Sequence, residues 1–201
     1  TMAWMQREPE RRVDVRKIVP GAKSVISVSL NYYHPVSHSN RADKGKISRY
    51  AWGDDYHVVM TPRIQSLVDC IKAEKPDIRS AAYVDTGPVM DKAWAVRAGI
   101  GWLGKHTNVI SKEFGSWVFL GEIILDVDLE YDEPVADFCG SCTACIEACP
   151  TAAIVEPYVL DSAKCISYLT IEHRGDSPEE LKPNLENWVY GCDICQDVCP
   201  W

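Results

Sequence analysis

Two cysteine runs decide the fold: Cys139-Gly-Ser-Cys142-Thr-Ala-Cys145-Ile-Glu-Ala-Cys149-Pro150 and Cys192-Asp-Ile-Cys195-Gln-Asp-Val-Cys199-Pro200. The first has the spacing that wraps three thiolates around one 4Fe–4S cube and sends the fourth thiolate to a second cube. The second run is one cysteine short of that pattern, and Cys165 is the thiol that can complete it. The spacing therefore predicts two clusters, one on Cys139, Cys142, Cys145 and Cys199, the other on Cys149, Cys165, Cys192 and Cys195.

Two other uses of cysteine fit these runs less well. Zinc sites use paired Cys-x-x-Cys motifs, and three cysteines followed by x-x-x-Cys-Pro is not a usual zinc spacing. A disulfide framework needs an oxidising compartment, and the chain shows no secretory signal. Nine cysteines without such a signal indicate the reducing cytoplasm, where thiolates remain available to iron.

The composition indicates a soluble globular protein of one or two domains. The chain has 201 residues, 46% of them apolar, without a continuous apolar run long enough to cross a membrane. Its net charge of −8 argues against a nucleic-acid partner. The charges are segregated, however, because residues 92–112 carry bases without an acid and residues 113–161 carry acids without a base.

Hydrophobic periodicity predicts an α+β arrangement before the cysteine runs. We expect strands at 24–30 and 80–85, and a pair of strands at 108–110 and 116–125. A helix from about residue 56 carries apolar residues at helical spacing, with Asp54 or Asp55 as its N-cap. Pro62 should kink or restart this helix. Cys70, near its apolar face, is predicted to be a core thiol.

Asp85 is placed at the end of one predicted strand and at the mouth of a helix over 89–98, which Gly99 should end. From the sequence alone, capping of that helix by Asp85 or Thr86 is the simpler role. Gly99, Gly101 and Gly104 match Gly-x-Gly-x-x-Gly, but they follow a helix instead of opening one, which excludes a dinucleotide site. They predict a loop that can approach a ligand closely.

Several motifs, in order along nearly the whole chain, resemble the epoxyqueuosine reductase family. They are Val84-Asp-Thr-Gly-Pro88, Arg97-Ala-Gly-Ile-Gly-Trp102, Gly104-Lys-His106, Cys139-Gly-Ser-Cys142, Ser167-Tyr-Leu-Thr-Ile-Glu-His-Arg-Gly175 and Trp188-Val-Tyr-Gly-Cys-Asp-Ile-Cys-Gln-Asp-Val-Cys-Pro-Trp201. Members of that family reduce epoxyqueuosine to queuosine at the wobble position of certain transfer RNAs, using cobalamin and two 4Fe–4S clusters.

The resemblance implies a particular fold. Residues 1–132 would form an α+β corrin-binding domain, nitroreductase-like and lacking its N-terminal part, and residues 133–201 a ferredoxin-like domain with two 4Fe–4S clusters. The helical-repeat region that grips RNA in family members is absent from the sequence. The resemblance further implies a cytoplasmic protein and, as partners, transfer RNA and an electron donor of unknown identity. We expect a monomer without a membrane contact.

The resemblance also assigns roles to residues. Asp85 matches the proton donor, which replaces its capping role, and a raised pKa would help this task. His57 matches a histidine near the cobalt. The positions that match residues lining the corrin are Ser48, Val109, Leu120, Ser167 and Asp193. His173 and Arg174 match a stretch near the RNA, where a guanidinium suits phosphate.

These matches predict where the corrin pocket lies. Its walls would be the strand end at Asp85, the loop from His106 to Val109 and the helix of Ser167. The cluster that Cys165 ligates should be the one beside the corrin, because Ser167 is only two residues further along the chain.

Two other classes of protein share part of this pattern. A corrinoid reductive dehalogenase combines cobalamin with two clusters but normally carries an export signal, which this sequence does not show. A plain two-cluster electron carrier accounts for the cysteines and leaves the residues that precede them without a function.

Overall fold

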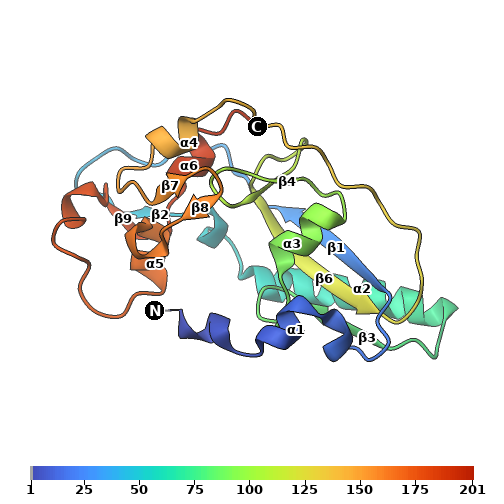
Figure 1. The fold of residues 1–201 in the computed structure, drawn as a ribbon. Helices are drawn as coiled ribbons and strands as arrows, with labels where there is room; N and C mark the ends of the chain where they lie inside the picture. Colours follow the sequence, from blue (N-terminus) through green and yellow to red (C-terminus); the bar gives the residue numbers. More distant parts are fainter. Residues whose placement is uncertain (1) are drawn as a thin grey trace.

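The computed structural model describes residues 2–201, and a three-stranded antiparallel sheet of order β1-β6-β3 forms its centre (Figure 1). These strands are β1 (Ser24–Asn31), β6 (Val118–Leu125) and β3 (Ser80–Tyr83). Ser24 pairs with Leu125 across β1 and β6, and Tyr83 pairs with Glu122 across β3 and β6. The last five residues of the central strand are buried, because both faces of the sheet are covered.

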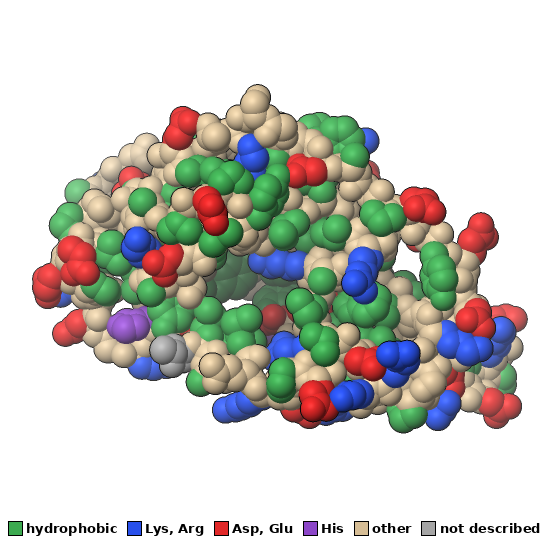
Figure 2. Space-filling view, viewed as in Figure 1, with side chains coloured by type: hydrophobic (Ala, Val, Ile, Leu, Met, Phe, Trp, Pro, Cys, Tyr) green, Lys and Arg blue, Asp and Glu red, His purple; other side chains and the backbone are tan. Residues whose placement is uncertain are grey.

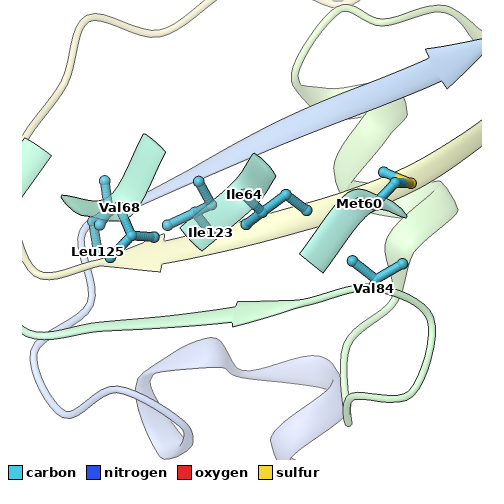
Figure 3. Close-up of a cluster of buried hydrophobic side chains, with 6 residues drawn as sticks. All are labelled: Met60, Ile64, Val68, Val84, Ile123 and Leu125. Carbon is cyan, nitrogen blue, oxygen red and sulfur yellow. The ribbon is translucent and has the colours of Figure 1, made fainter. Parts of the chain in front are cut away.

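Helix α2 (Tyr56–Glu74) covers one face of the sheet. Its buried residues Met60, Ile64 and Val68 recur every fourth position, which places them on one stripe of the helix. Figure 3 shows this stripe above the sheet; the six residues of the cluster are Met60, Ile64, Val68, Val84, Ile123 and Leu125. Asp55 is the N-cap, as the sequence predicts, and accepts a hydrogen bond from the amide of His57 at 2.9 Å.

The opposite face of the sheet packs against α3 (Asp91–Arg97) and the first residues of the chain. That first segment contains 3-10 turns at Ala3–Gln6 and Val15–Lys17 around the short helix α1 (Pro9–Val13). The buried residues of this smaller core are Val15, Val19, Val89 and Ile124. Gly99 follows α3 with φ of 74°, so the predicted helix end is confirmed.

The cysteine-rich part is made of short elements that lie beside the sheet in Figure 1, in orange and red. They are α4 (Ala144–Glu147), β7 (Ile154–Glu156), β8 (Val159–Leu160), α5 (Ile166–Ile171), β9 (Trp188–Tyr190) and α6 (Ile194–Asp197), with 3-10 turns at Ser162–Lys164 and Lys182–Asn184. Helices α4 and α6 pack together, so the two cysteine runs are neighbours. β9 pairs with β2 (Lys46–Ile47), which follows the sheet's first strand in sequence and precedes a 3-10 turn at Arg49–Ala51.

The predicted pairing of residues 108–110 with 116–125 is wrong. β5 (Val109–Ile110) pairs with β4 (Trp102–Leu103), and β6 lies between β1 and β3 instead. An isolated bridge joins Ser111 to Gly115, which both lie between the two predicted strands. β6 is the central strand of the sheet, and β1 and β3 pair with its two edges, so neither edge is left for residues 108–110.

The prediction that Cys70 is a core thiol is also wrong, since Cys70 is exposed. It lies two residues beyond buried Val68, and two residues turn an α-helix by about 200°, to the opposite side. The restart at Pro62 does not occur either, because α2 continues through that residue. Residues 161–172 form a 3-10 turn followed by α5, and the segment after Pro178 contains only the turn at Lys182–Asn184.

The expected mixture of helices and strands is confirmed. Within residues 2–201, none of the helices has the length and apolar character that a membrane crossing requires.

Candidate active site

A cavity of about 920 Å³ lies between the sheet and the cysteine-rich part. Figure 2 looks onto a hollow at this place, with hydrophobic side chains and a basic side chain along its rim. Its walls come from the start of α2, the turn that follows β3, the loop between β4 and β5, the first half of β6, and α5. Segments far apart in sequence therefore converge on one space.

Six of the seven residues expected to contact a corrin line this cavity. They are Ser48, His57, Asp85, Val109, Leu120 and Ser167. The seventh, Asp193, is fully buried behind the wall. It accepts hydrogen bonds from the amide of Arg49 at 2.9 Å, from the Arg49 guanidinium at 3.1 Å and from the hydroxyl of Ser48. Asp193 therefore ties the segment that carries Ser48 to the second cysteine run.

The cysteines divide between the cavity and the region behind it. Cys149, Cys165, Cys192 and Cys195 line the cavity, and these are the four thiols of the second predicted cluster. Burial, followed by the charges of Cys165 and Cys149 among others, raises the pKa of Cys192 to about 12. Burial, followed by Cys139, Cys199 and Cys142, raises the pKa of Cys145. The cysteine charges that raise the pKa values of Cys192 and Cys145 thus come from the set of thiols predicted for each.

Within residues 2–201, no group of three or more His, Cys, Asp or Glu side chains is arranged to hold a single metal ion. In a 4Fe–4S cube each cysteine binds a different iron, so its four thiolates stand around the outside of the cube. Thiols whose pKa is raised are protonated near neutral pH, and iron must displace those protons on binding.

Asp85, in the cavity wall, has an unusual backbone conformation. Its φ is 60°, and the amide of Thr86 donates to the carbonyl of Val84 at 2.6 Å across it. This is a γ-turn with positive φ, a rare and strained conformation. The side chain is 60% exposed, and α3 begins only at Asp91 without a side-chain cap. The capping role considered for Asp85 is therefore excluded.

Two side chains at the start of α2 face the Asp85 carboxylate. The Tyr56 hydroxyl donates to its Oδ2 at 2.7 Å, and His57 Nε2 lies 3.8 Å from the same oxygen. Burial and the carboxylate of Asp85 raise the pKa of Tyr56 far above its usual range, so the hydroxyl keeps its proton. His57 Nδ1 lies 2.8 Å from Asp55 Oδ1, which favours the proton on Nδ1. His57 Nε2 is buried without a partner among the described residues.

His106 and Lys92 form the wall opposite α2. His106 Nδ1 accepts from the amide of Asn108 at 3.2 Å, while its Nε2 is buried without a hydrogen-bond partner in residues 2–201. Burial, helped by the charge of Lys92, lowers the pKa of His106 to about 4, so the ring is neutral. Lys92 Nζ donates to Thr107 O at 2.9 Å and to Asn108 Oδ1 at 3.1 Å. Burial lowers its pKa.

A pair of acids lies behind the cavity, where α3 packs against β6. Glu122 is fully buried in the central strand, opposite Ser27 on β1 and Tyr83 on β3. Burial, followed by Asp91, raises the pKa of Glu122 to about 10, so this carboxyl is neutral at pH 7. Burial also raises the pKa of Asp91. Both pKa values are raised further by the charge of Asp85.

His173 and Arg174 follow α5 and do not line the cavity. His173 Nε2 lies 3.0 Å from the carbonyl of Asp176, and Arg174 Nη1 donates to the carbonyl of Ile171 at 2.9 Å. Their neighbours Ile171 and Glu172 are part of the lining. The structure thus places both residues beside the rim.

Sequence reasoning missed several residues of the site, among them Tyr56, Lys92 and the buried Glu122. Tyr56 precedes His57 and Lys92 follows Asp91, but nothing in their spacing marks them as partners of Asp85. Glu122 carried the one available signal, because it interrupts an otherwise apolar strand from Val118 to Leu125. An acid in such a run is buried, and buried acids are usually functional or paired.

Two families match parts of the chain. Residues 12–86 match the family described as epoxyqueuosine reductase QueG, DUF1730, and residues 138–201 match a 4Fe-4S double cluster binding domain. The chain is 54% identical over 201 residues to an epoxyqueuosine reductase of Synechocystis, all of this chain aligning with 69% of that protein. Other curated relatives have 65% of their length covered.

Solved structures of epoxyqueuosine reductases have the same fold. One, with an epoxyqueuosine-modified tRNA-Tyr stem loop, matches with a TM-score of 0.88 at 41% identity over 95% of this chain. Another, from Bacillus subtilis, has a catalytic aspartate loop swung out of its active site and matches with a TM-score of 0.89 at 38% identity over 96% of this chain. This chain spans 52% of each of them. The chain therefore belongs to the epoxyqueuosine reductase family.

Proposed function

We propose that this protein reduces epoxyqueuosine in transfer RNA to queuosine, with electrons supplied through two 4Fe–4S clusters and cobalamin. One observation carries the proposal: the same cavity is lined by Asp85 and by the four thiols of the second predicted cluster. A reductase needs its electron source and its acid at one substrate, and this cavity provides both. A plain electron carrier has no use for such a cavity.

The cluster ligands follow from the spacing and are supported by the electrostatic couplings. Cys139, Cys142, Cys145 and Cys199 would hold the outer cluster, and Cys149, Cys165, Cys192 and Cys195 the one at the cavity. Cys199 shows the same grouping, since its pKa is raised by burial and then by Cys139 and Cys142. The match of residues 138–201 to a double cluster domain supports the same count.

The residues present fit a cobalamin in the cavity. Its volume, about 920 Å³, is near the upper end of the range for ligand sites, about 300–1,000 Å³. Two buried ring nitrogens, Nε2 of His57 and Nε2 of His106, have no hydrogen-bond partner among residues 2–201, although buried polar groups normally form hydrogen bonds. A bound cofactor or substrate would satisfy them. Ser48, Val109, Leu120 and Ser167 would hold the corrin, in a nitroreductase-like domain ending near residue 132.

When bound, cobalamin supplies low-valent cobalt, which can deliver electrons to the substrate. The role of Asp85 is to protonate the oxygen that leaves the epoxide carbons. Tyr56 donates to its Oδ2, which leaves Oδ1 free to hold the proton. The strained turn that carries Asp85 aims the carboxyl into the cavity, and strain of this kind is usually retained for function. Asp85 thus acts where negative charge develops.

Transfer RNA is proposed as the macromolecular partner, with His173 and Arg174 contacting its backbone beside the cavity rim. The solved relative with an epoxyqueuosine-modified stem loop supports this partner. A guanidinium suits phosphate because it donates two parallel hydrogen bonds. We further propose that the protein acts as a cytoplasmic monomer, served by an electron donor of another chain.

The test is reduction of an epoxyqueuosine-modified tRNA stem loop by anaerobically reconstituted protein, followed by mass spectrometry. Loss of one oxygen from the modified base is expected with cobalamin and a low-potential reductant present. The same reaction with cobalamin omitted is the control and should leave the epoxide intact. Turnover independent of cobalamin, or no turnover by protein that holds both clusters and cobalamin, would contradict the proposal.

A further inference from the structure

Lys105 is a buried cation in the loop between β4 and β5. Its residue is 8% exposed, and its Nζ donates to the carbonyl of Gly140 at 2.6 Å and to that of Cys142 at 2.8 Å. Both carbonyls belong to the segment that begins the first cysteine run. The next residue of the loop, His106, lines the cavity. One short loop therefore touches both the cavity and the region of the outer cluster.

The charge of Lys105 has no carboxylate partner among residues 2–201. The acid beside this segment, Asp137, is occupied otherwise, since its carboxylate accepts from the amide of Cys139 at 2.7 Å and from the Tyr158 hydroxyl. An ammonium has three N–H donors, and the two carbonyls take two of them. The charge of Lys105 contributes to lowering the pKa of Asp137, but the two side chains form no ion pair. Burying a cation without a paired counter-charge is costly, so a closer anion would stabilise Lys105.

The proposed outer cluster would supply this anion. Lys105 clamps the backbone between Cys139 and Cys142, and these two thiols with Cys145 and Cys199 are the proposed ligands of the outer cluster. Four thiolates around a 4Fe–4S cube carry net negative charge, which increases by one on reduction. A fixed cation nearby stabilises the reduced form more than the oxidised form, because Coulomb attraction grows with the charge.

We propose that Lys105 is the charge partner of the cluster held by Cys139, Cys142, Cys145 and Cys199, that it positions the loop of that cluster, and that it raises the cluster's reduction potential. The proposal rests on the proposed function only for the presence of this cluster. One electron enters from the external donor, and the cluster is reduced. A higher potential at this cluster makes the entry of that electron more favourable.

The experiment uses the full chain, reconstituted anaerobically, in a redox titration followed by electron paramagnetic resonance. Lys105→Met removes the charge and both hydrogen bonds, and Lys105→Gln removes the charge while keeping a donor. Lys164→Met is the matched control, because Lys164 is exposed, pairs with Asp161 at 3.7 Å and adjoins Cys165 of the other cluster. We expect the midpoint potential of one cluster to move downward in both Lys105 variants. The midpoint potential of the other cluster should change in neither variant.

Unchanged potentials, an upward shift, or equal shifts of both clusters in the Lys105 variants would overturn the proposal. Loss of one cluster alone in Lys105→Met, with that cluster retained at a lower potential in Lys105→Gln, supports both parts of it. Loss of both clusters in both variants would show a general folding role and overturn it. Iron content of the unmodified chain keeps the two proposals apart, because a chain without two clusters refutes the proposed function before Lys105 is tested.

Discussion

Asp85 is held by its neighbours in a conformation that an aspartate adopts at a cost of about 1–3 kcal/mol. Its φ of 60° places the carboxyl against Tyr56 and within 3.8 Å of His57, and Asp85 does not cap α3. Asp85→Asn keeps the shape and one acceptor oxygen but has no proton to give. Turnover should fall about a hundredfold or more, the usual scale of general-acid help.

The Asp85→Asn substitution should leave iron content and cobalamin binding unchanged, which separates an acid role of Asp85 from a structural one. Asn is tolerated at positive φ at least as well as Asp, so the turn itself should survive. Stopped reactions quantified by mass spectrometry give the rates. Near-normal turnover of the Asn variant would show that Asp85 is not the proton donor and would make His57 and Asp91 the next candidates.

Glu122 makes stability depend on pH in a direction opposite to that of most acids. Its pKa is about 10 in the folded protein against 4.5 as the ordinary value, so folded chains keep a proton that unfolded chains lose between these values. The stability that the neutral carboxyl contributes is fully present below pH 4.5 and is lost as pH rises toward 10. The loss is at most about 1.4 kcal/mol per pH unit.

Glu122→Gln removes this titration and keeps the size of the side chain. We expect the free energy of unfolding of the variant, relative to the unmodified protein, to rise steadily from about pH 5 to about pH 9. Urea unfolding at several pH values measures it, with Glu74→Gln as an exposed control that should show no trend. A difference that stays constant with pH would show that Glu122 is already ionised in the folded state.

The chemistry of single residues was only partly visible in the sequence. Cysteine spacing predicted the two sets of thiols, and the two-residue step from Cys165 to Ser167 predicted that the set containing Cys165 lies at the cavity. The neutral state of Glu122 and the tyrosine on Asp85 depend on strands and helices that meet only after folding. Cys70 was wrongly predicted to be buried because it is close in sequence to the apolar stripe of α2. A residue beside the stripe in sequence can still lie on another side of the helix.

The hairpin of β4 and β5 positions His106 and Lys105, and Gly101 allows it to close. A Cβ atom at Gly101 would overlap the carbonyl oxygen of Ile110, a backbone atom that cannot move without breaking the hairpin. Gly101→Ala should therefore destabilise the protein by about 1–3 kcal/mol. Gly53→Ala is the control, since a Cβ there meets nothing within 4 Å and should change stability by less than about 0.5 kcal/mol.

Thermal or urea unfolding of the two glycine variants measures the difference. Equal stabilities would mean that the hairpin opens at little cost and that His106 is not held rigidly.

At this scale the sequence predicted the types of element better than their partners. Periodicity reports which face of a strand is buried, whereas the order β1-β6-β3 depends on which edges remain to be covered.

At the scale of the whole molecule, the seven cysteines of the two runs together with Cys165 should account for all bound iron. We expect about eight irons per chain after anaerobic reconstitution, from two four-iron cubes. Cys70→Ala should leave that number unchanged, because Cys70 is exposed on α2 far along the chain from both runs. Cys165→Ala should reduce it to about four. Iron analysis decides, and a loss of iron on removing Cys70 would contradict the ligand assignment.

The central claim is that the cavity between the sheet and the cysteine-rich part holds cobalamin beside the second cluster. The most direct measurement is absorbance of the reconstituted chain titrated with cobalamin at micromolar concentration, repeated with flavin mononucleotide. We predict binding of one cobalamin per chain and none of the flavin, with cobalamin binding abolished by Ser167→Trp, which fills the cavity. Binding of the flavin in place of cobalamin, or cobalamin binding unaffected by Ser167→Trp, would contradict the account.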